Sequence, residues 1–158
     1  YQTGEPIPAE IVERIIAAQN YLAAYLNVRQ LSFGLTDMAW HTITEPFEGD
    51  VEQFEVASMA PSQVLPVVPG TAMAPAFGHI FSGGYAAGYY GYKWAEVLEA
   101  DAFSLFKEKG IFNREVSGSF RENILSKGGT EHPMELYVRF RGHKPETKAL
   151  IEKMGLGK

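Results

Sequence analysis

Apolar residues recur along most of this chain with the spacing of α-helices. Between residues 8 and 30, one apolar face is formed by Ile11, Ile15, Ala18, Leu22 and Leu26. These intervals of three and four residues follow the 3.6-residue helical turn. The same pattern predicts further helices at 31–41, 50–60, 84–109, 113–125, 133–141 and 146–154. Strand-like alternation is almost absent from the sequence, so we expect an all-α, multi-helix bundle.

Residues that favour helix ends support several of these boundaries. Asp50 is expected to cap the helix at 50–60. The inward side chains of that helix would be Val51, Phe54 and Val56. Gly110 is expected to end the helix at 84–109. Its inner stripe would consist of Trp94, Val97, Leu98 and Leu105.

A proline-rich stretch separates the third helix from the fourth. Residues 61–76 contain four prolines and one glycine, which predicts a loop. The stretch is also apolar, with Val64, Leu65, Val67 and Val68. Linkers between domains are usually polar, so a loop lying on the protein surface is favoured over a linker.

Composition and charge exclude several classes of function. With 46% hydrophobic and 21% charged residues, the chain is an ordinary globular sequence rather than a disordered one. A net charge of -5 offers no basic patch, so no nucleic-acid partner is expected. No apolar run approaches the roughly 20 residues of a membrane helix, so no membrane partner is expected. The absence of cysteine excludes disulfides and thiolate chemistry.

The richest chemistry lies between Phe77 and Trp94, in FGHIFSGGYAAGYYGYKW. It combines one histidine, a glycine pair and several tyrosines: His79, Gly83, Gly84, Tyr85, Tyr89 and Tyr92. On a helix, the last three would share one face. The pattern indicates a movable loop before a helix that offers phenolic donors and one imidazole to a substrate. The alternative is that the tyrosines are an aromatic packing stripe.

Other candidate chemistry is weaker. The four histidines are scattered and no H-E-x-x-H motif occurs, so no zinc site is predicted within the chain. His41 and Glu45 are four residues apart, but Pro46 follows them directly. Several arginines are candidates to clamp a carboxylate: Arg114, Arg121, Arg139 and Arg141.

The tyrosine segment also carries a resemblance. FGHIFSGGYAAGYYGYKWAEVL resembles the C-terminal active-site segment of the thimet oligopeptidase family of zinc metallopeptidases. Within that family, AAGYYGYKWAEVLEADAF most resembles the bacterial peptidyl-dipeptidase branch. The resemblance continues through SFRENILSKGGTEHPMELYVRFRGHKP and reaches back through GEPIPAEIVERIIAAQNYLAAYLNVRQL. It therefore spans essentially the whole chain, except that the family's zinc-binding H-E-x-x-H helix is missing.

The resemblance implies that residues 1–158 are the C-terminal helical part of a peptidase catalytic domain. It implies catalytic roles for His79, Tyr85 and Tyr92, and substrate binding for Gly83, Gly84 and Tyr89. Zinc would activate a water in the intact enzyme, while phenols of this chain stabilise the carbonyl oxygen. The expected partners are short peptide substrates and the missing N-terminal part. The chain alone would bind no zinc and would be inactive.

Two other readings remain open at this point. The chain could be a stand-alone helical module that binds a peptide or an aromatic ligand, or a purely structural helical domain. The start at Tyr1 without methionine suggests a processed chain or a fragment, and MGLGK resembles a natural C-terminus. Any oligomer could then be an artefact of truncation. The expected compartment is the cytoplasm, with the periplasm as alternative.

Overall fold

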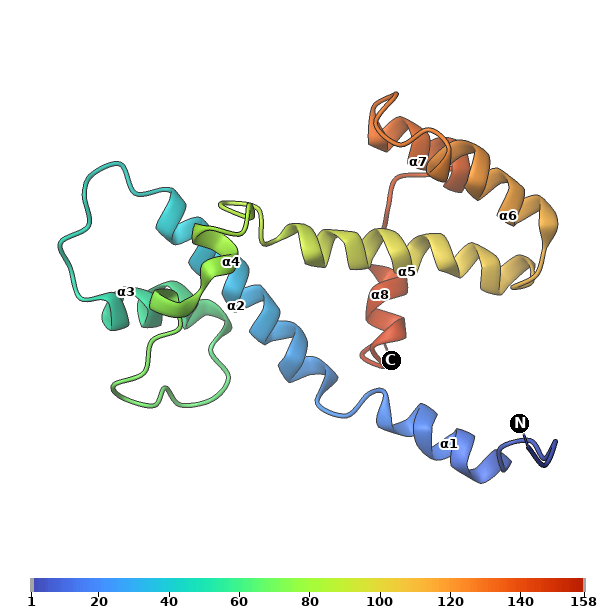
Figure 1. Ribbon diagram of the computed structural model, residues 1–158, viewed down its shortest axis with the longest axis horizontal. Helices are drawn as coiled ribbons and strands as arrows, with labels where there is room; N and C mark the ends of the chain where they lie inside the picture. The colour runs from blue at the N-terminus through green and yellow to red at the C-terminus, as the bar shows by residue number, and fades with distance from the viewer. Residues whose placement is uncertain (1, 158) are drawn as a thin grey trace. The chain divides into compact units, whose positions relative to one another are not determined.

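The computed structural model describes residues 2–157. Within this range it contains α-helices, 3-10 turns and one π-helical segment, and no strand (Figure 1). The all-α expectation is confirmed. The chain forms two compact units, Tyr1–Gly91 and Tyr92–Lys158, which are described separately. The boundary falls inside the tyrosine-rich segment and not in the proline-rich loop. No helix in residues 2–157 is both long enough and apolar enough to cross a membrane.

Over the described residues 2–91, the first unit contains four α-helices and two 3-10 turns. These are α1 (Ala9–Ala18), α2 (Ala23–His41), α3 (Val51–Met59), η1 (Ala60–Ser62), η2 (Ala74–Ala76) and α4 (Gly78–Phe81). The helix predicted at 8–30 is wrong, because the chain leaves the helix at residue 19. Leu22 then adopts a left-handed conformation with φ of 55°. The apolar stripe stays in phase across this break, so the spacing alone does not reveal it.

Helices α2 and α3 pack through an aromatic group centred on Trp40. Its ring lies 4.3 Å from that of Phe54 and 4.9 Å from that of Phe47, measured between centroids. Phe81 of α4 is 6.0 Å away from the same ring, so all three helices meet there (Figure 1). This packing holds α4 against α2 and α3, and α4 leads directly into the turns at residues 82–90.

The expected inward face of α3 is partly wrong. Asp50 does cap the helix, because its Oδ1 accepts the amide hydrogen of Gln53 at 2.9 Å. Val51 and Phe54 are half-buried, but Val56 is 37% exposed. The buried side chain is Glu55 instead. A buried carboxylate needs strong hydrogen-bond partners, and those of Glu55 come from the end of the proline-rich loop, as described below.

The second unit is built around the long helix α5 (Gly91–Lys109). It also contains α6 (Arg114–Phe120), the π-helical η3 (Arg121–Leu125), α7 (Pro133–Arg141) and α8 (Lys148–Lys153). Ala102 of α5 packs with Val116, Tyr137 and Phe140, and Val97 and Ala100 pack with Leu150 of α8. The α6–α7 pair and α8 therefore lie on opposite sides of α5 (Figure 1).

Most predictions for the second unit are confirmed. Gly110 has φ of 106° and follows the last residue of α5, which is the left-handed conformation expected of a helix-ending glycine. Val97 is buried, and Leu98 and Leu105 pack against the core. Trp94 is the exception, since 44% of it is exposed.

Candidate functional site

The helix that follows the glycine pair begins later than the sequence predicts. Residues 82–90 are turns and bends, and α5 begins only at Gly91. The prediction of a helix from residue 84 is therefore wrong, and so is the shared helical face of the tyrosines. Gly84 and Ala87 have φ of 81° and 52°, and such left-handed residues interrupt a right-handed helix.

The turns nevertheless bring the histidine and two tyrosines together. His79 is an exposed residue of α4. Its ring centroid lies 5.2 Å from that of Tyr85, with 33° between the planes. The ring of Tyr89 is 6.0 Å from His79 and stands at 74° to it. Phe77 adds a further ring, 5.4 Å from Tyr89. The cluster is a continuous aromatic surface in the first unit.

Within this cluster the two tyrosines differ. The hydroxyl of Tyr89 donates to Oε1 of Gln30 at 2.9 Å. Burial raises the pKa of Tyr89, although nearby Arg29 and the bond to Gln30 act in the opposite direction. Tyr85 is 40% exposed. Tyr89 is therefore mainly a wall of the cluster, whereas the side chains of Tyr85 and His79 are exposed.

The two glycines serve different purposes. A Cβ on Gly83 would lie 2.8 Å from the carbonyl oxygen of His79 and 3.0 Å from its Cα. Gly83 is therefore required by a close approach of two backbone segments. A Cβ on Gly84 would meet nothing within 4 Å, but the residue has φ of 81°. Gly84 is required by its conformation.

Tyr92 belongs to the second unit. It lies in the first turn of α5 and is 39% exposed. The aromatic packing alternative predicts buried hydroxyls. An exposed fraction near two-fifths for both Tyr85 and Tyr92 does not favour that alternative at these two positions.

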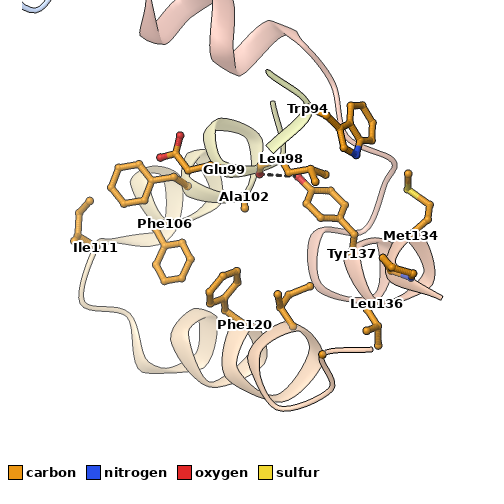
Figure 2. Close-up of a pocket in the computed structure, with 14 residues that line it drawn as sticks. Trp94, Leu98, Glu99, Ala102, Phe106, Ile111, Phe120, Met134, Leu136 and Tyr137 are labelled. Atoms are coloured by element: carbon orange, nitrogen blue, oxygen red, sulfur yellow. Dashed lines mark hydrogen bonds between the residues drawn. The ribbon is translucent and has the colours of Figure 1, made fainter. Parts of the chain in front are cut away.

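The second unit also contains an apolar cavity of about 700 Å³ between α5 and the α6–α7 pair. Figure 2 shows the rings of Phe106, Phe120 and Tyr137 around it. Among the described residues that line it, only Glu99 is charged. The Tyr137 hydroxyl donates to Asp101 at 2.6 Å. None of the sequence-predicted site residues lines this cavity, and its polarity does not suit polar catalysis.

Sequence reasoning missed two buried carboxylates beside the candidate segment. Asp37 is fully buried in α2, and Glu55 is 8% exposed in α3. Asp37 is spaced four residues after Phe33 and three before Trp40, so it lies on the apolar face of its helix. An acidic residue on the apolar face of a predicted helix is the sequence signal that could have indicated a buried carboxylate at Asp37. Its partners lie about fifty residues further along the chain, which no local pattern shows.

Three of the remaining candidates have side-chain partners of their own. Nδ1 of His41 lies 2.8 Å from Oδ1 of Asp37, which identifies Asp37 as its acidic partner. Arg139 pairs with Glu131 at 2.6 Å. Arg141 donates to Ser104 at 2.9 Å. These contacts give the three side chains structural roles.

The residues present do not fit a zinc ion. Across residues 2–157, no group of three or more histidine, aspartate, glutamate or cysteine side chains is placed to hold a metal. Any ligand set for such an ion would therefore have to include residues outside this range.

The first unit thus combines a helical fold with an exposed imidazole–phenol pair, His79 and Tyr85. The comparison with known families makes this specific. The chain belongs to Peptidase family M3, whose family model matches residues 1–156. This confirms the family resemblance that was carried by the tyrosine segment.

Individual relatives match over almost the whole chain. Oligopeptidase A of Escherichia coli is 49% identical over 159 residues, which are 99% of this chain and 23% of that protein. Dipeptidyl carboxypeptidase of Escherichia coli is 38% identical over 158 residues, with the same two shares. Saccharolysin of Saccharomyces cerevisiae is 30% identical over 162 residues, covering 99% of this chain and 22% of that protein. The chain therefore spans about a quarter of the length of the curated relatives it matches.

Proposed function

We propose that this chain is the C-terminal substrate-binding and transition-state-stabilising part of a zinc-dependent oligopeptidase or peptidyl-dipeptidase. Such an enzyme would hydrolyse short peptides, and the chain would be inactive on its own. The family match over residues 1–156 supports the class. The names of the two Escherichia coli relatives support peptides as substrates. We expect the cytoplasm as the compartment, with the periplasm as the alternative.

The observation that carries the proposal is the exposed His79–Tyr85 pair. The two rings lie 5.2 Å apart with 33° between their planes, and they come from α4 and from the turns that follow it in the first unit. A phenol has a pKa of about 10, so it keeps its proton near neutral pH. It can therefore donate a hydrogen bond to a peptide oxygen that gains negative charge. The imidazole of His79 supplies a second polar group for the same peptide.

Four further residues have supporting roles. Tyr92 is a second phenolic donor, placed by the first turn of α5. Gly83 and Gly84 shape the turn against which a peptide would lie. Tyr89 binds substrate through its ring, because its hydroxyl already donates to Gln30.

Peptidase family M3 is zinc-dependent in general. The described residues do not fit that ion, so the proposal assigns its ligands to the part of the enzyme outside this chain. The contribution of the chain itself is to bind the peptide, to orient its carbonyl group and to donate hydrogen bonds to the oxygen.

The proposal is tested with Tyr85→Phe and Tyr92→Phe in the whole enzyme that contains this chain. Each substitution removes one donor and keeps the ring. We expect kcat to fall by about 10²–10³ with little change in KM, as for other lost oxyanion donors. Tyr21→Phe is the matched control, because Tyr21 is 75% exposed and lies outside the cluster. Wild-type kcat in both test variants would remove the assignment.

A second candidate function is supported by the apolar cavity of the second unit. Its volume of about 700 Å³ and its aromatic lining suit an aromatic ligand. The chain would then be a stand-alone binding module without catalysis. Calorimetry of the isolated chain separates the two functions. If the isolated chain binds an aromatic compound and Leu136→Trp abolishes the binding, the stand-alone binding module is favoured. If neither aromatic compounds nor short peptides give a heat of binding, the C-terminal part of a peptidase is favoured.

A further inference from the structure

Two buried carboxylates hold the segment that carries His79 and Tyr85 at its two flanks. Asp37 extends from α2 and is fully buried, and Glu55 extends from α3 and is 8% exposed. His79 and Tyr85 themselves are exposed. An exposed segment makes few packing contacts of its own, and these contacts hold it only weakly in place. Its position must then be set by the groups that bind its backbone.

Asp37 binds the C-terminal flank through both of its carboxylate oxygens. Oδ1 accepts the amide hydrogen of Ala87 at 2.9 Å, and Oδ2 accepts that of Tyr89 at 2.8 Å. Nδ1 of His41 also lies 2.8 Å from Oδ1. Hydrogen bonds to an ionised acceptor are roughly twice as strong as neutral ones. The carboxylate therefore imposes the turn on residues 87–89.

The conformation of Ala87 shows that this turn is imposed from outside. Its φ of 52° lies in the left-handed region, which costs a residue with a Cβ roughly 1–2 kcal/mol. Such a conformation persists where surrounding contacts determine it. The bond from Ala87 to the buried Asp37 is a contact of this kind.

Glu55 binds the N-terminal flank in the same manner. Its oxygens accept the amide hydrogen of Met73 at 2.8 and 2.9 Å and that of Ala74 at 2.6 Å. These amides stand at the start of η2, which leads directly into α4. Between the two flanks, Ile80 is fully buried and fixes the middle of the segment.

We infer that Asp37 and Glu55 are positioning residues for the reaction of His79 and Tyr85. They act through the backbone of residues 73–74 and 87–89 and do not touch the substrate. The inference rests on the proposed function. A misplacement of about 1 Å in a catalytic group can lower the rate by about 10²-fold, so a loosened anchor should lower kcat without removing either side chain.

The first test measures amide hydrogen exchange of residues 86–90 in the whole enzyme, because two of these amides bind Asp37. Asp37→Asn keeps the shape of the side chain but turns one acceptor into a donor. We expect the amides of Ala87 and Tyr89 to exchange at least tenfold faster. Asp50→Asn is the matched control, because Asp50 also accepts a backbone amide hydrogen in the first unit, away from the segment. Unchanged exchange in folded Asp37→Asn would overturn the inference.

The second test asks whether the anchor works through Tyr85. We expect Asp37→Asn to lower kcat at least tenfold with KM changed less than threefold. In the double variant with Tyr85→Phe, the loss should be clearly smaller than the product of the two single fold-losses, because both changes remove the interaction made by Tyr85. A simple loss of stability would instead give additive effects. Additive losses, or wild-type kcat in Asp37→Asn, would contradict positioning.

The outcomes separate the inference from the proposed function. If Tyr85→Phe and Tyr92→Phe leave kcat unchanged, the proposed function fails, whatever the exchange rates show. If Tyr85→Phe lowers kcat but Asp37→Asn does not, only the inference fails. Should Asp37→Asn not fold, Glu55→Gln is measured at the amides of Met73 and Ala74 with the same two criteria. Unchanged exchange and kcat in Glu55→Gln would then overturn the inference.

Discussion

Close backbone contacts and backbone conformation determine which side chains are tolerated at positions 83 and 84, between His79 and Tyr85. The neighbouring residues Gly83 and Gly84 look equivalent in the sequence, yet one is required by contact and the other by conformation. A methyl group on Gly83 would press against the backbone of His79, which cannot move independently of α4. A methyl group on Gly84 would have space around it but an unfavourable φ.

We predict that the two glycines respond differently to alanine and asparagine. Gly83→Ala and Gly83→Asn should both destabilise the chain by about 1–3 kcal/mol, as overpacking does. Gly84→Ala should cost about 1–2 kcal/mol, and Gly84→Asn less, because asparagine tolerates left-handed φ. Urea denaturation of the four variants measures these differences. Equal costs for alanine and asparagine at Gly84 would contradict the conformational explanation.

At the scale of elements, one polar network joins α5 to α7 inside an otherwise apolar interface. Tyr137 is 7% exposed and donates to Asp101. Arg141 lies 3.5 Å from the same carboxylate and also donates to the Asp101 carbonyl. Burial of the phenol, followed by its bond to Asp101, raises the pKa of Tyr137. The hydrogen bond from Tyr137 to Asp101 thus depends on the protonation of the phenol.

This network predicts a loss of stability in alkali. A raised pKa means that the folded state keeps the proton at a pH where the unfolded chain has lost it. The contribution is complete below the ordinary phenol pKa of about 10 and is lost as the pH rises above it. We expect Tyr137→Phe to cost about 1.5–3 kcal/mol at pH 7 and to flatten the alkaline decline.

Denaturant titrations at pH 7, 9 and 11 provide the measurement. Tyr21→Phe is the control for phenols in general, because Tyr21 is 75% exposed. The alkaline slope should change in Tyr137→Phe and stay the same in Tyr21→Phe. Parallel slopes in all three proteins would show that Tyr137 does not carry the effect.

The helix bounds show which parts of the fold could be predicted from the sequence. The helix predicted at 133–141 is observed with the same bounds, because Pro133 starts it and Gly142, with φ of 86°, follows its end. The breaks at Leu22 and Ala87 were not predicted. Neither residue type signals a left-handed conformation, and the turn at Ala87 depends on bonds to a distant helix. The candidate cluster came from a motif, whereas its anchors required the tertiary structure.

At the scale of the whole molecule, apolar surface is unusually abundant. The stripe that predicted the first helix is exposed in the structure, at 40% for Ile11, 52% for Ile15 and 51% for both Leu22 and Leu26. No residue of α1 is buried among the described residues. Large exposed apolar patches usually mark interaction surfaces. In the proposed enzyme, the polypeptide outside this chain would cover them.

We predict that the isolated chain self-associates as its concentration rises, because association removes this apolar surface from water. Ile15→Lys should reduce the association, since it places a charge within the stripe. Ala17→Lys is the control, with the same change of charge on the other face of α1. Multi-angle light scattering measures the mass. A monomer at all concentrations, or equal effects of both variants, would contradict the prediction.

The tethering of the proline-rich loop at one end has a practical consequence. Glu52 accepts the amide hydrogen of Gly70, and Glu55 accepts that of Met73. Val64, which precedes both contacts in the chain, is 59% exposed. The sequence has no cysteine, so Val64→Cys introduces a unique thiol for a spectroscopic label. Along the chain, the contacts of Glu52 and Glu55 lie between the label and the segment with His79 and Tyr85. The signal of the label would therefore report on the motion of the loop without disturbing the aromatic cluster.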